Sequence, residues 1–316
     1  MGAASIHGAR ARSLREQFEL ELLDGLRADE PAVSPKWFYD DIGSQLFERI
    51  CELDEYYPTR TEFALLARHA SEFAALVGEG VELIEFGAGA MAKVRALLAT
   101  LRAVARYVPI DISGEHLERA AEELRTRRPG LRVEPLAADF TRELELGPAS
   151  GRRVGFFAGS SIGNFNPGEA ERLLRRMARW LRGGGLLIGV DLIKSPAVLH
   201  AAYNDSKGVT AQFNLNLLAR ANRELAADFD LAQFEHAAFY NPPEQRIEMH
   251  LISRRGQCVR IGAHTHEFDE GDSFRTECSH KYTVEGFRRL ARAAGFEPRH
   301  VWLDEQRFFA LHWLAC

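Results

Sequence analysis

The segment VELIEFGAGAMAKVRALLATLRAVARYVPIDIS, residues 81–113, decides the fold of this chain. It has the pattern of an apolar strand that ends in glycines, then a helix, then a second apolar strand that ends in an acid. Helical and apolar strand patterns continue to alternate downstream, at 113–130, 131–140, 152–164, 167–185 and 186–193. Strict alternation of this kind predicts an α/β fold with a parallel, doubly wound, Rossmann-type sheet.

The segments on either side of this region lack the alternation. Apolar residues at helical spacing predict three helices ahead of it, at 13–27, 40–53 and 59–77. The third would begin with Thr59 or Thr61 as its N-cap. After Lys194 the chain is mostly helical as far as residue 230. The stretch 246–274 then alternates apolar and polar residues around an Arg-Arg-Gly turn, which predicts a β-hairpin.

The C-terminal part returns to the pattern of the central sheet. A helix is expected at 283–296, followed within 297–315 by two strands that are antiparallel because the turn at Asp304 and Glu305 is short. We therefore expect two parts, each assembled from separate segments of the chain. They are a Rossmann-like domain from 63–194 plus 283–316, and a substrate-binding lid module from 1–62 plus 195–282.

Composition places the chain among ordinary globular proteins, with 46% hydrophobic and 27% charged residues. The net charge of −5 and the pI near 6.2 argue against a nucleic-acid partner. No apolar run is long enough for a membrane span, and the N-terminal residues lack the apolar core of a signal peptide, so we expect a frayed tail there. The four cysteines, at 51, 258, 278 and 316, lie far apart, which predicts reduced thiols in a cytoplasmic protein. Nothing in the sequence demands an oligomer, and we expect a monomer.

The first strand and the second strand end in residues that suit a nucleoside. The turn EFGAGAMAK at 85–93 holds Gly87 and Gly89, which let the backbone approach a ligand closely. This turn is not the GxGxxG fingerprint of a pyrophosphate site. Asp111 ends the second strand, where a carboxylate is placed to bind a ribose diol.

Two further strand ends lead to the same edge of the sheet. Asp139 and Phe140 follow the third strand and suit an adenine, while GSSIGN at 159–164 adds another glycine-rich turn after the fourth. Because the carboxyl ends of parallel strands share one crevice, these signals predict one adenosine-type ligand without phosphate. S-adenosylmethionine (SAM) fits that description best, and NAD is the alternative.

Several longer motifs make the sequence recognisable. The stretches KWFYDDIGSQLFERI, EYYPTRTE, YNDSKGVTAQFNLNLL, NRELAADFD, RIEM and TECSHKY, together with the two glycine turns, resemble the histidine-specific Nα-methyltransferase family from about Leu14 to the C-terminus. The resemblance implies a class I methyltransferase fold with an extra substrate domain. It also implies an activity, the SAM-dependent conversion of L-histidine to its trimethyl betaine, hercynine, on the way to ergothioneine.

The resemblance also assigns site residues. SAM would be held by Tyr39, Gly87, Lys93, Asp111, Asp139 and Phe140. L-histidine would be bound by Tyr56, Gly159, Asn164, Tyr203, Glu277 and Ser279. The sequence departs from the family at Ala88, where serine is commoner, and at Met91-Ala92, where family members are often polar.

The residue types themselves suit this substrate. Asn164 and Tyr203 can donate to a carboxylate, Glu277 can accept from an imidazole N–H, and Ser279 can serve the other ring nitrogen. The α-amine has a pKa near 8, so it needs no strong base, and water or a tyrosine hydroxyl suffices as proton acceptor.

Aromatic faces tolerate the cationic products of successive methylation. We therefore expect Tyr39 and Tyr56 at the reacting end, as catalytic residues, in an aromatic segment that closes as a lid. Trp37, Phe38 and Phe47 would form the core of that lid.

Other readings remain open at this stage. The same fold and cofactor could serve another aromatic amino acid or an indole amine, or the protein could bind SAM without catalysis. His264 and His266, with Glu267, share a strand and could ligate a metal, but the hairpin would expose them and we expect no metal site. Asp191 and Lys194, after the fifth strand, read as simple sheet-edge residues.

Overall fold

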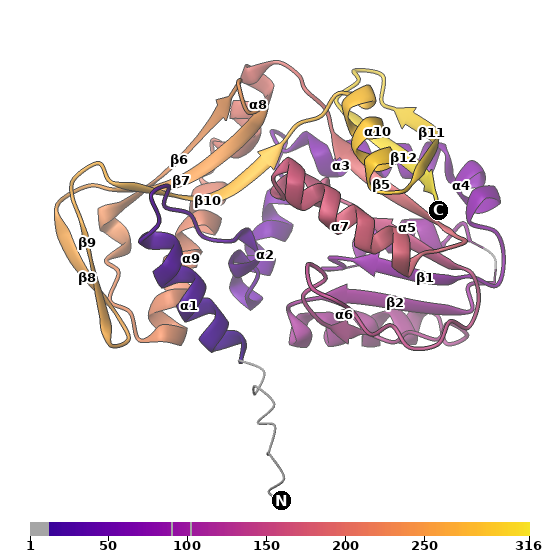
Figure 1. Ribbon diagram of the computed structural model, residues 1–316, viewed down its shortest axis with the longest axis horizontal. Coiled ribbons are helices and arrows are strands. Elements are labelled where there is room, and N and C mark those ends of the chain that lie inside the picture. Colours follow the sequence, from indigo (N-terminus) through magenta and orange to yellow (C-terminus); the bar gives the residue numbers. More distant parts are fainter. Residues whose placement is uncertain (1–12, 90, 102) are drawn as a thin grey trace, which may run out of the picture.

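The computed structural model describes residues 13–89, 91–101 and 103–316. Its largest element is a seven-stranded sheet in the order β11-β12-β5-β4-β1-β2-β3 (Figure 1). The strands are β1 (Glu82–Phe86), β2 (Arg106–Asp111), β3 (Leu136–Ala137), β4 (Arg153–Phe157), β5 (Gly185–Asp191), β11 (Glu297–Leu303) and β12 (Phe309–Ala315). β1 to β5 pair in parallel, whereas β12 is antiparallel to β5 and to β11. The predicted doubly wound α/β sheet is confirmed.

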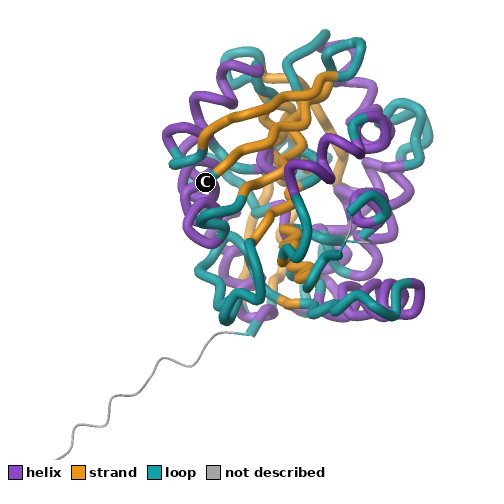
Figure 2. The backbone as a smooth tube through the Cα atoms, turned by 90° about the vertical axis from the view of Figure 1, so that its right-hand side faces the viewer, coloured by secondary structure: helices purple, strands orange, loops and turns teal. Residues whose placement is uncertain are grey.

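Helices cover both faces of this sheet, and Figure 2 shows the strands running between them. One face packs against α3 (Tyr57–Arg68), α4 (Ala70–Val77), α5 (Ala92–Leu98) and α6 (Gly114–Arg127). The other packs against α7 (Pro167–Trp180) and α10 (Val284–Ala293). Alternate strand residues serve the two faces: Leu83 of β1 faces the first group of helices, and Ile84 the second.

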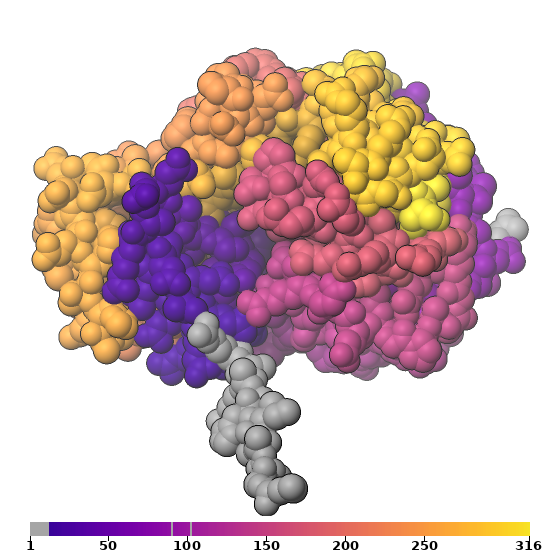
Figure 3. All heavy atoms as spheres, in the orientation of Figure 1, coloured from indigo at the N-terminus to yellow at the C-terminus, as the bar shows by residue number. Residues whose placement is uncertain are grey.

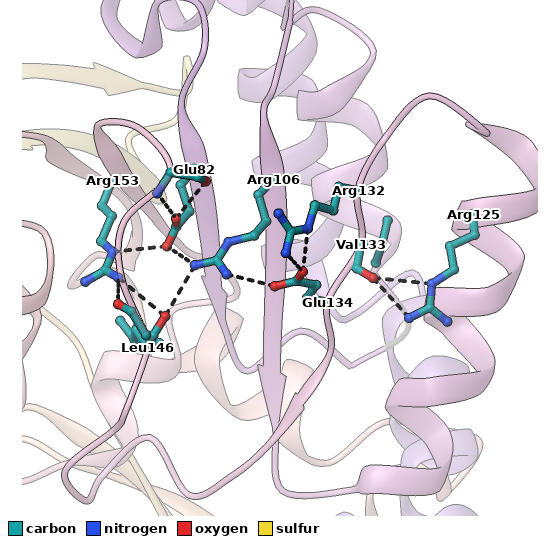
Figure 4. Close-up of polar contacts among 10 residues, drawn as sticks. Glu82, Arg106, Arg125, Arg132, Val133, Glu134, Leu146 and Arg153 are labelled. Carbon is teal, nitrogen blue, oxygen red and sulfur yellow. Dashed lines mark hydrogen bonds and ion pairs between the residues drawn. The ribbon is translucent and has the colours of Figure 1, made fainter.

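A buried carboxylate holds the amino end of the sheet together. Glu82, at the start of β1, is fully buried and accepts hydrogen bonds from Ser150 and from Arg153, at 3.0 Å from the guanidinium. Arg106 of β2 lies 2.7 Å from the same carboxylate and also pairs with Glu134 (Figure 4). Although burial opposes ionisation of Glu82, the hydrogen bonds from the arginines and from Ser150 lower its pKa.

The second part of the molecule lies at the other end of the view in Figure 1. Its three-stranded antiparallel sheet has the order β10-β7-β6, from β6 (Phe234–Asn241), β7 (Arg246–Ser253) and β10 (Ser273–His280). One hydrophobic core joins this sheet to helices from two separate segments of the chain, 14–51 and 196–225. These are α1 (Leu14–Leu26), η1 (Pro35–Phe38), α2 (Asp41–Cys51), α8 (Pro196–Tyr203) and α9 (Val209–Leu225). Trp37 and Phe38 are buried in it, as expected of a lid core.

Three local predictions are wrong. The Arg-Arg-Gly turn does not close a hairpin: β7 pairs with β6 and β10, while β8 (Gln257–Ile261) pairs with β9 (His264–Phe268). The helix expected at 59–77 is divided at His69 into α3 and α4. It also begins earlier than expected, with Tyr56 rather than Thr59 or Thr61 in the capping position, because Pro58 is suited to a first helical turn.

Other expectations concern the ends of elements and of the chain. The strand expected at 131–140 is reduced to the short β3, with one further bridge at Val133. The frayed N-terminal tail lies outside the described residues. Among the described helices none is long and apolar enough to cross a membrane. The boundaries of the two predicted domains stay a prediction, although the hydrophobic clusters separate close to them.

Candidate active site

A cavity of about 1500 Å³ lies between the two parts, at the carboxyl edge of the large sheet. Figure 3 shows the molecule hollowed where the N-terminal segment (indigo) meets the sheet domain (magenta to rose). Every residue predicted for the SAM or histidine site lines this one cavity. The structure therefore brings together side chains from β1, β2, β10, α5, α8 and the loops between them. Their individual roles stay predictions.

The glycine turn after β1 has the backbone that a close ligand requires. Gly87 has a φ of +69°, and a Cβ there would lie 3.6 Å from the ring of Phe140. The carboxylate of Asp111 anchors the turn, because it accepts the N–H of Gly89 at 3.0 Å and that of Ser113 at 3.0 Å. Burial raises the pKa of Asp111, although these backbone donors oppose the shift. The geometry fits a nucleoside held at the tips of β1 and β2.

Asp139 connects the third strand tip to the N-terminal segment. Its carboxylate lies 3.3 Å from Nζ of Lys36, which also pairs with Glu21 of α1 at 2.8 Å. Although burial opposes it, hydrogen bonds from Thr141 and the charge of Lys36 lower the pKa of Asp139. Lys36 was not singled out from the sequence, although it opens the KWFYDD motif. It ties the segment that precedes the cavity to the cofactor end of the sheet.

Lys93 is held by a residue that the sequence analysis also missed. Its Nζ lies 2.7 Å from the carboxylate of Glu62, which is fully buried on α3. The same carboxylate accepts the N–H of Gly159 at 2.9 Å. A Cβ at Gly189 would lie 2.2 Å from Glu62, so only glycine leaves room for this carboxylate. Glu62 thus fixes Lys93 beside the turn that follows β4.

Aromatic rings cover one wall of the cavity. Phe47 packs edge-on against Tyr39 and Tyr56, with ring centroids 5.6 Å and 6.2 Å apart, and Tyr56 in turn meets Tyr203 at 6.4 Å. Burial raises the pKa of both Tyr39 and Tyr56 well above the ordinary value. Both phenols therefore stay protonated at neutral pH. Phe47 lines the cavity itself, so it is more exposed to a ligand than a core residue would be.

Glu277 is the most distinctive group in the cavity. No hydrogen bond or ion pair joins its carboxylate to any residue that the structure describes. Burial raises its pKa to about 7, while Lys281 opposes the shift. The side-chain amide of Asn164 likewise lines the cavity without a hydrogen bond to the described residues. Its η2 turn (Ser161–Asn164) approaches β10 closely, since a Cβ at Gly163 would lie 2.8 Å from the carbonyl oxygen of His280.

Tyr203 and Ser279 form a hydroxyl pair at the end of the cavity. Their oxygens are 2.8 Å apart, and Nζ of Lys281 lies 2.7 Å from Ser279 and 3.1 Å from Tyr203. Lys281 also pairs with Asp191 at 2.8 Å. A buried polar network therefore stands directly behind two of the predicted histidine-binding residues.

Asp191 is the centre of this network. It pairs with Lys194 at 2.5 Å and accepts a hydrogen bond from Tyr57 at 2.7 Å. The prediction that Asp191 and Lys194 are simple sheet-edge residues is therefore wrong in one respect. Both lie at the carboxyl end of β5, but their side chains are only 1% and 2% exposed. Composition and spacing gave no signal for this network, because its members are scattered along the chain.

The histidine pair on β9 is not part of the cavity. His264 is exposed and His266 partly so. Among the described residues no group of three or more His, Cys, Asp or Glu side chains is placed to hold a metal ion.

Comparisons with known proteins place the chain in a family. The model of the histidine-specific, SAM-dependent methyltransferase family matches residues 18–316. A histidine N-alpha-methyltransferase of Mycolicibacterium smegmatis is 40% identical over 307 residues, covering 95% of each chain. Ergothioneine biosynthesis protein 1 of Neurospora crassa is 32% identical over 299 residues, covering 88% of this chain and 32% of that protein.

Among solved structures, a possible exported protein of Bordetella parapertussis is similar in fold. Its TM-score is 0.50 at 13% identity, and the match covers 95% of this chain and 93% of that one. At that identity the likeness concerns the fold alone. The family match extends over nearly the whole chain and confirms the expected methyltransferase fold, the methyltransferase activity and SAM as the cofactor. The chain belongs to the histidine-specific, SAM-dependent methyltransferase family.

Proposed function

We propose that this enzyme methylates the α-amine of L-histidine three times and releases the trimethyl betaine, hercynine, as in ergothioneine biosynthesis. The observation that carries the proposal is Glu277, a carboxylate that faces the cavity with no hydrogen-bond partner among the described residues. Leaving such a group unpaired is unfavourable, so the site favours a ligand that donates an N–H there. The imidazole of histidine supplies that donor.

We also propose which residues bind the cofactor. Tyr39, Gly87, Lys93, Asp111, Asp139 and Phe140 would hold SAM, which supplies an electrophilic methyl group on a sulfonium sulfur. Gly87 supports this assignment, because its positive φ is one that residues with a side chain rarely adopt, so the backbone at the tip of β1 stays open to a ligand. Lys93 supports it as a cation fixed by Glu62 at the same edge of the sheet.

The substrate end would orient histidine for attack. We assign Tyr56, Gly159, Asn164, Tyr203, Glu277 and Ser279 to it. The neutral amine attacks the methyl carbon as the carbon–sulfur bond breaks. In the first two transfers the proton left on nitrogen passes to water, and the third transfer leaves a quaternary ammonium with no proton to release. Because Tyr39 and Tyr56 are protonated, they act as dipoles beside the amine rather than as bases. Orientation of this kind can supply about 7–11 kcal/mol of the barrier reduction.

The second candidate keeps the fold and cofactor but takes an indole amine or another aromatic amino acid. Tryptophan also carries an N–H for Glu277, so that residue alone separates it less well from histidine. A SAM-binding protein without catalysis would have no need of Asn164, Tyr203 and Glu277 in one cavity. We also propose a monomeric, cytoplasmic protein, which agrees with four cysteines that are all free thiols.

Mass spectrometry tests the substrate directly. Purified enzyme is incubated with SAM and an equimolar mixture of the standard amino acids. The expected result is a single product, histidine carrying three added methyl groups, which disappears with Glu277→Ala. Methylation of tryptophan or another amino acid in place of histidine would overturn the substrate proposal, while the fold and the cofactor would stand.

A further inference from the structure

Lys281 does not belong to the set of residues expected to touch SAM or histidine, yet it is among the most completely bonded groups in the molecule. Its side chain is 1% exposed. Its three N–H groups match three oxygen acceptors: Ser279 at 2.7 Å, Asp191 at 2.8 Å and Tyr203 at 3.1 Å. An ammonium group donates only, so both hydroxyl oxygens must accept from it.

This geometry fixes the direction of the two hydroxyl groups. Neither O–H of the Tyr203–Ser279 pair can point toward Lys281, because the ammonium occupies a lone pair on each oxygen. Each O–H must then point toward the other hydroxyl or into the cavity that both residues line. Only one hydrogen is needed for the bond between the two oxygens. At least one O–H is therefore left to donate to whatever occupies the cavity.

We propose that Lys281 is a positioning residue that makes the Tyr203–Ser279 pair a hydrogen-bond donor toward the substrate, and so selects a ring with an acceptor nitrogen. This inference rests on the proposed function and adds to it. Glu277 accepts a hydrogen bond from an N–H of the substrate ring, and the Tyr203–Ser279 pair donates one to the other ring nitrogen. A neutral imidazole has one N–H and one acceptor nitrogen and satisfies both. Indole has the N–H alone, so the pair's O–H would lack an acceptor in the ring.

The groups around Lys281 keep it charged. Although burial by itself favours the neutral amine, the carboxylate of Asp191 raises the pKa of Lys281 well above its ordinary value. Lys194 shares the same carboxylate, and burial lowers its pKa to about 8. Removing Lys281 would still leave Asp191 paired with Lys194 and bonded to Tyr57. The substitution Lys281→Met therefore strands no buried carboxylate, which makes it a usable test.

The test compares two histidine analogues with the same ring size. β-(Pyrrol-3-yl)alanine keeps an N–H at the position of Nε2 but has no acceptor nitrogen, and β-(thiazol-4-yl)alanine keeps an acceptor nitrogen at the position of Nδ1 but has no N–H. We measure kcat/KM for both analogues and for histidine, with wild type and with Lys281→Met. The wild-type preference for histidine over the pyrrole should shrink about tenfold in Lys281→Met, because the hydroxyls are then free to turn. The preference for histidine over the thiazole, which depends on Glu277, should stay within about twofold.

Lys194→Met is the matched control. It removes the other ammonium from Asp191, and Lys194 has no contact with Tyr203 or Ser279 among the described residues, so both preferences should match wild type. Thermal unfolding and SAM affinity check that each variant is folded. An unchanged preference against the pyrrole in folded Lys281→Met would overturn the inference and leave a purely structural lysine.

Wild type alone provides a second route if Lys281→Met does not fold. Equal kcat/KM for histidine and the pyrrole analogue would show that no donor faces the ring, and would overturn the inference. A wild-type kcat/KM that is clearly lower for the pyrrole analogue, which lacks the acceptor nitrogen, than for histidine supports the inference. Failure of wild type to methylate histidine at all would instead overturn the proposed function.

Discussion

Two glutamates at opposite ends of the molecule have opposite environments. Glu82, at the amino edge of the large sheet, lies among two arginines and Ser150, and its pKa is lowered. Glu277 lies in the cavity at the carboxyl edge, has no hydrogen bond or ion pair to the residues that the structure describes, and its pKa is raised to about 7. The fold supplies the partners of the first carboxylate. The second has none among the described residues, and this difference is why we propose a binding role for Glu277 and a stabilising role for Glu82.

The largest expected effect comes from breaking the ion pairs of Glu82 at the amino edge of the large sheet. Glu82→Gln removes the charge that Arg106 and Arg153 share at 2.7 Å and 3.0 Å. We expect the free energy of unfolding to fall by about 3–5 kcal/mol, because two partly buried arginines lose their buried counter-charge. Denaturant unfolding measures the loss, and kcat/KM of the remaining folded enzyme should stay close to wild type. Unchanged stability would show that this network does not stabilise the sheet.

The second prediction concerns Glu277, where we expect a loss of activity with no loss of stability. Glu277→Gln should lower kcat/KM for histidine roughly 10- to 150-fold, the equivalent of about 1.5–3 kcal/mol for a hydrogen bond to a charged group. Stability should stay the same or rise, since a partly buried carboxylate without a partner does not stabilise the fold. Steady-state kinetics and unfolding are measured on the same preparation. A large loss of stability with normal kinetics would mean that Glu277 is structural, like Glu82.

The third prediction concerns the Lys93–Glu62 pair, which combines a buried ion pair, as at Glu82, with a proposed ligand contact, as at Glu277. Lys93→Met should weaken SAM binding about tenfold, and it should also destabilise the fold because it strands the buried carboxylate of Glu62. The double variant Lys93→Met/Glu62→Gln removes both charges and should recover most of the stability but not the SAM affinity. Calorimetry with SAM and thermal unfolding separate the two effects. Recovery of SAM affinity in the double variant would contradict a cofactor role for Lys93.

The smallest effect is the pH dependence of histidine binding. A raised pKa means that Glu277 keeps its proton to higher pH, so the carboxylate that accepts an N–H predominates only above about pH 7. Affinity should therefore fall as the pH falls, by about tenfold between pH 8 and pH 6. The ratio of wild-type to Glu277→Gln affinity is the quantity to plot, because ionisation of histidine itself cancels in it. A flat ratio over this range would show that the pKa of Glu277 lies elsewhere.

Sequence patterns were reliable where the physics is local. The alternation of apolar strands and helices after residue 81 predicted the sheet, and Asp111 and Asp139 were expected at its edge because parallel strands end together. The hairpin predicted at the Arg-Arg-Gly turn was wrong. The alternation of apolar and polar residues in β7 indicates a strand, but it does not indicate which strands pair with it, and these are β6 and β10. The helix caps at Thr59 and Thr61 were wrong because the helix already begins at Tyr57, with Pro58 in its first turn.

The sequence by itself determined the parallel sheet, SAM as the cofactor and, through long motifs, the methyltransferase family. Only the tertiary structure decided which polar groups are paired. Glu62 with Lys93, and Asp191 with Lys281, come from segments far apart along the chain, so no spacing reveals them. The physical reason is that burial and pairing depend on what surrounds a side chain in space. Glu82 and Glu277 are the same residue type, and only their surroundings give one its ion-pair partners and leave the other facing the cavity without one among the described residues.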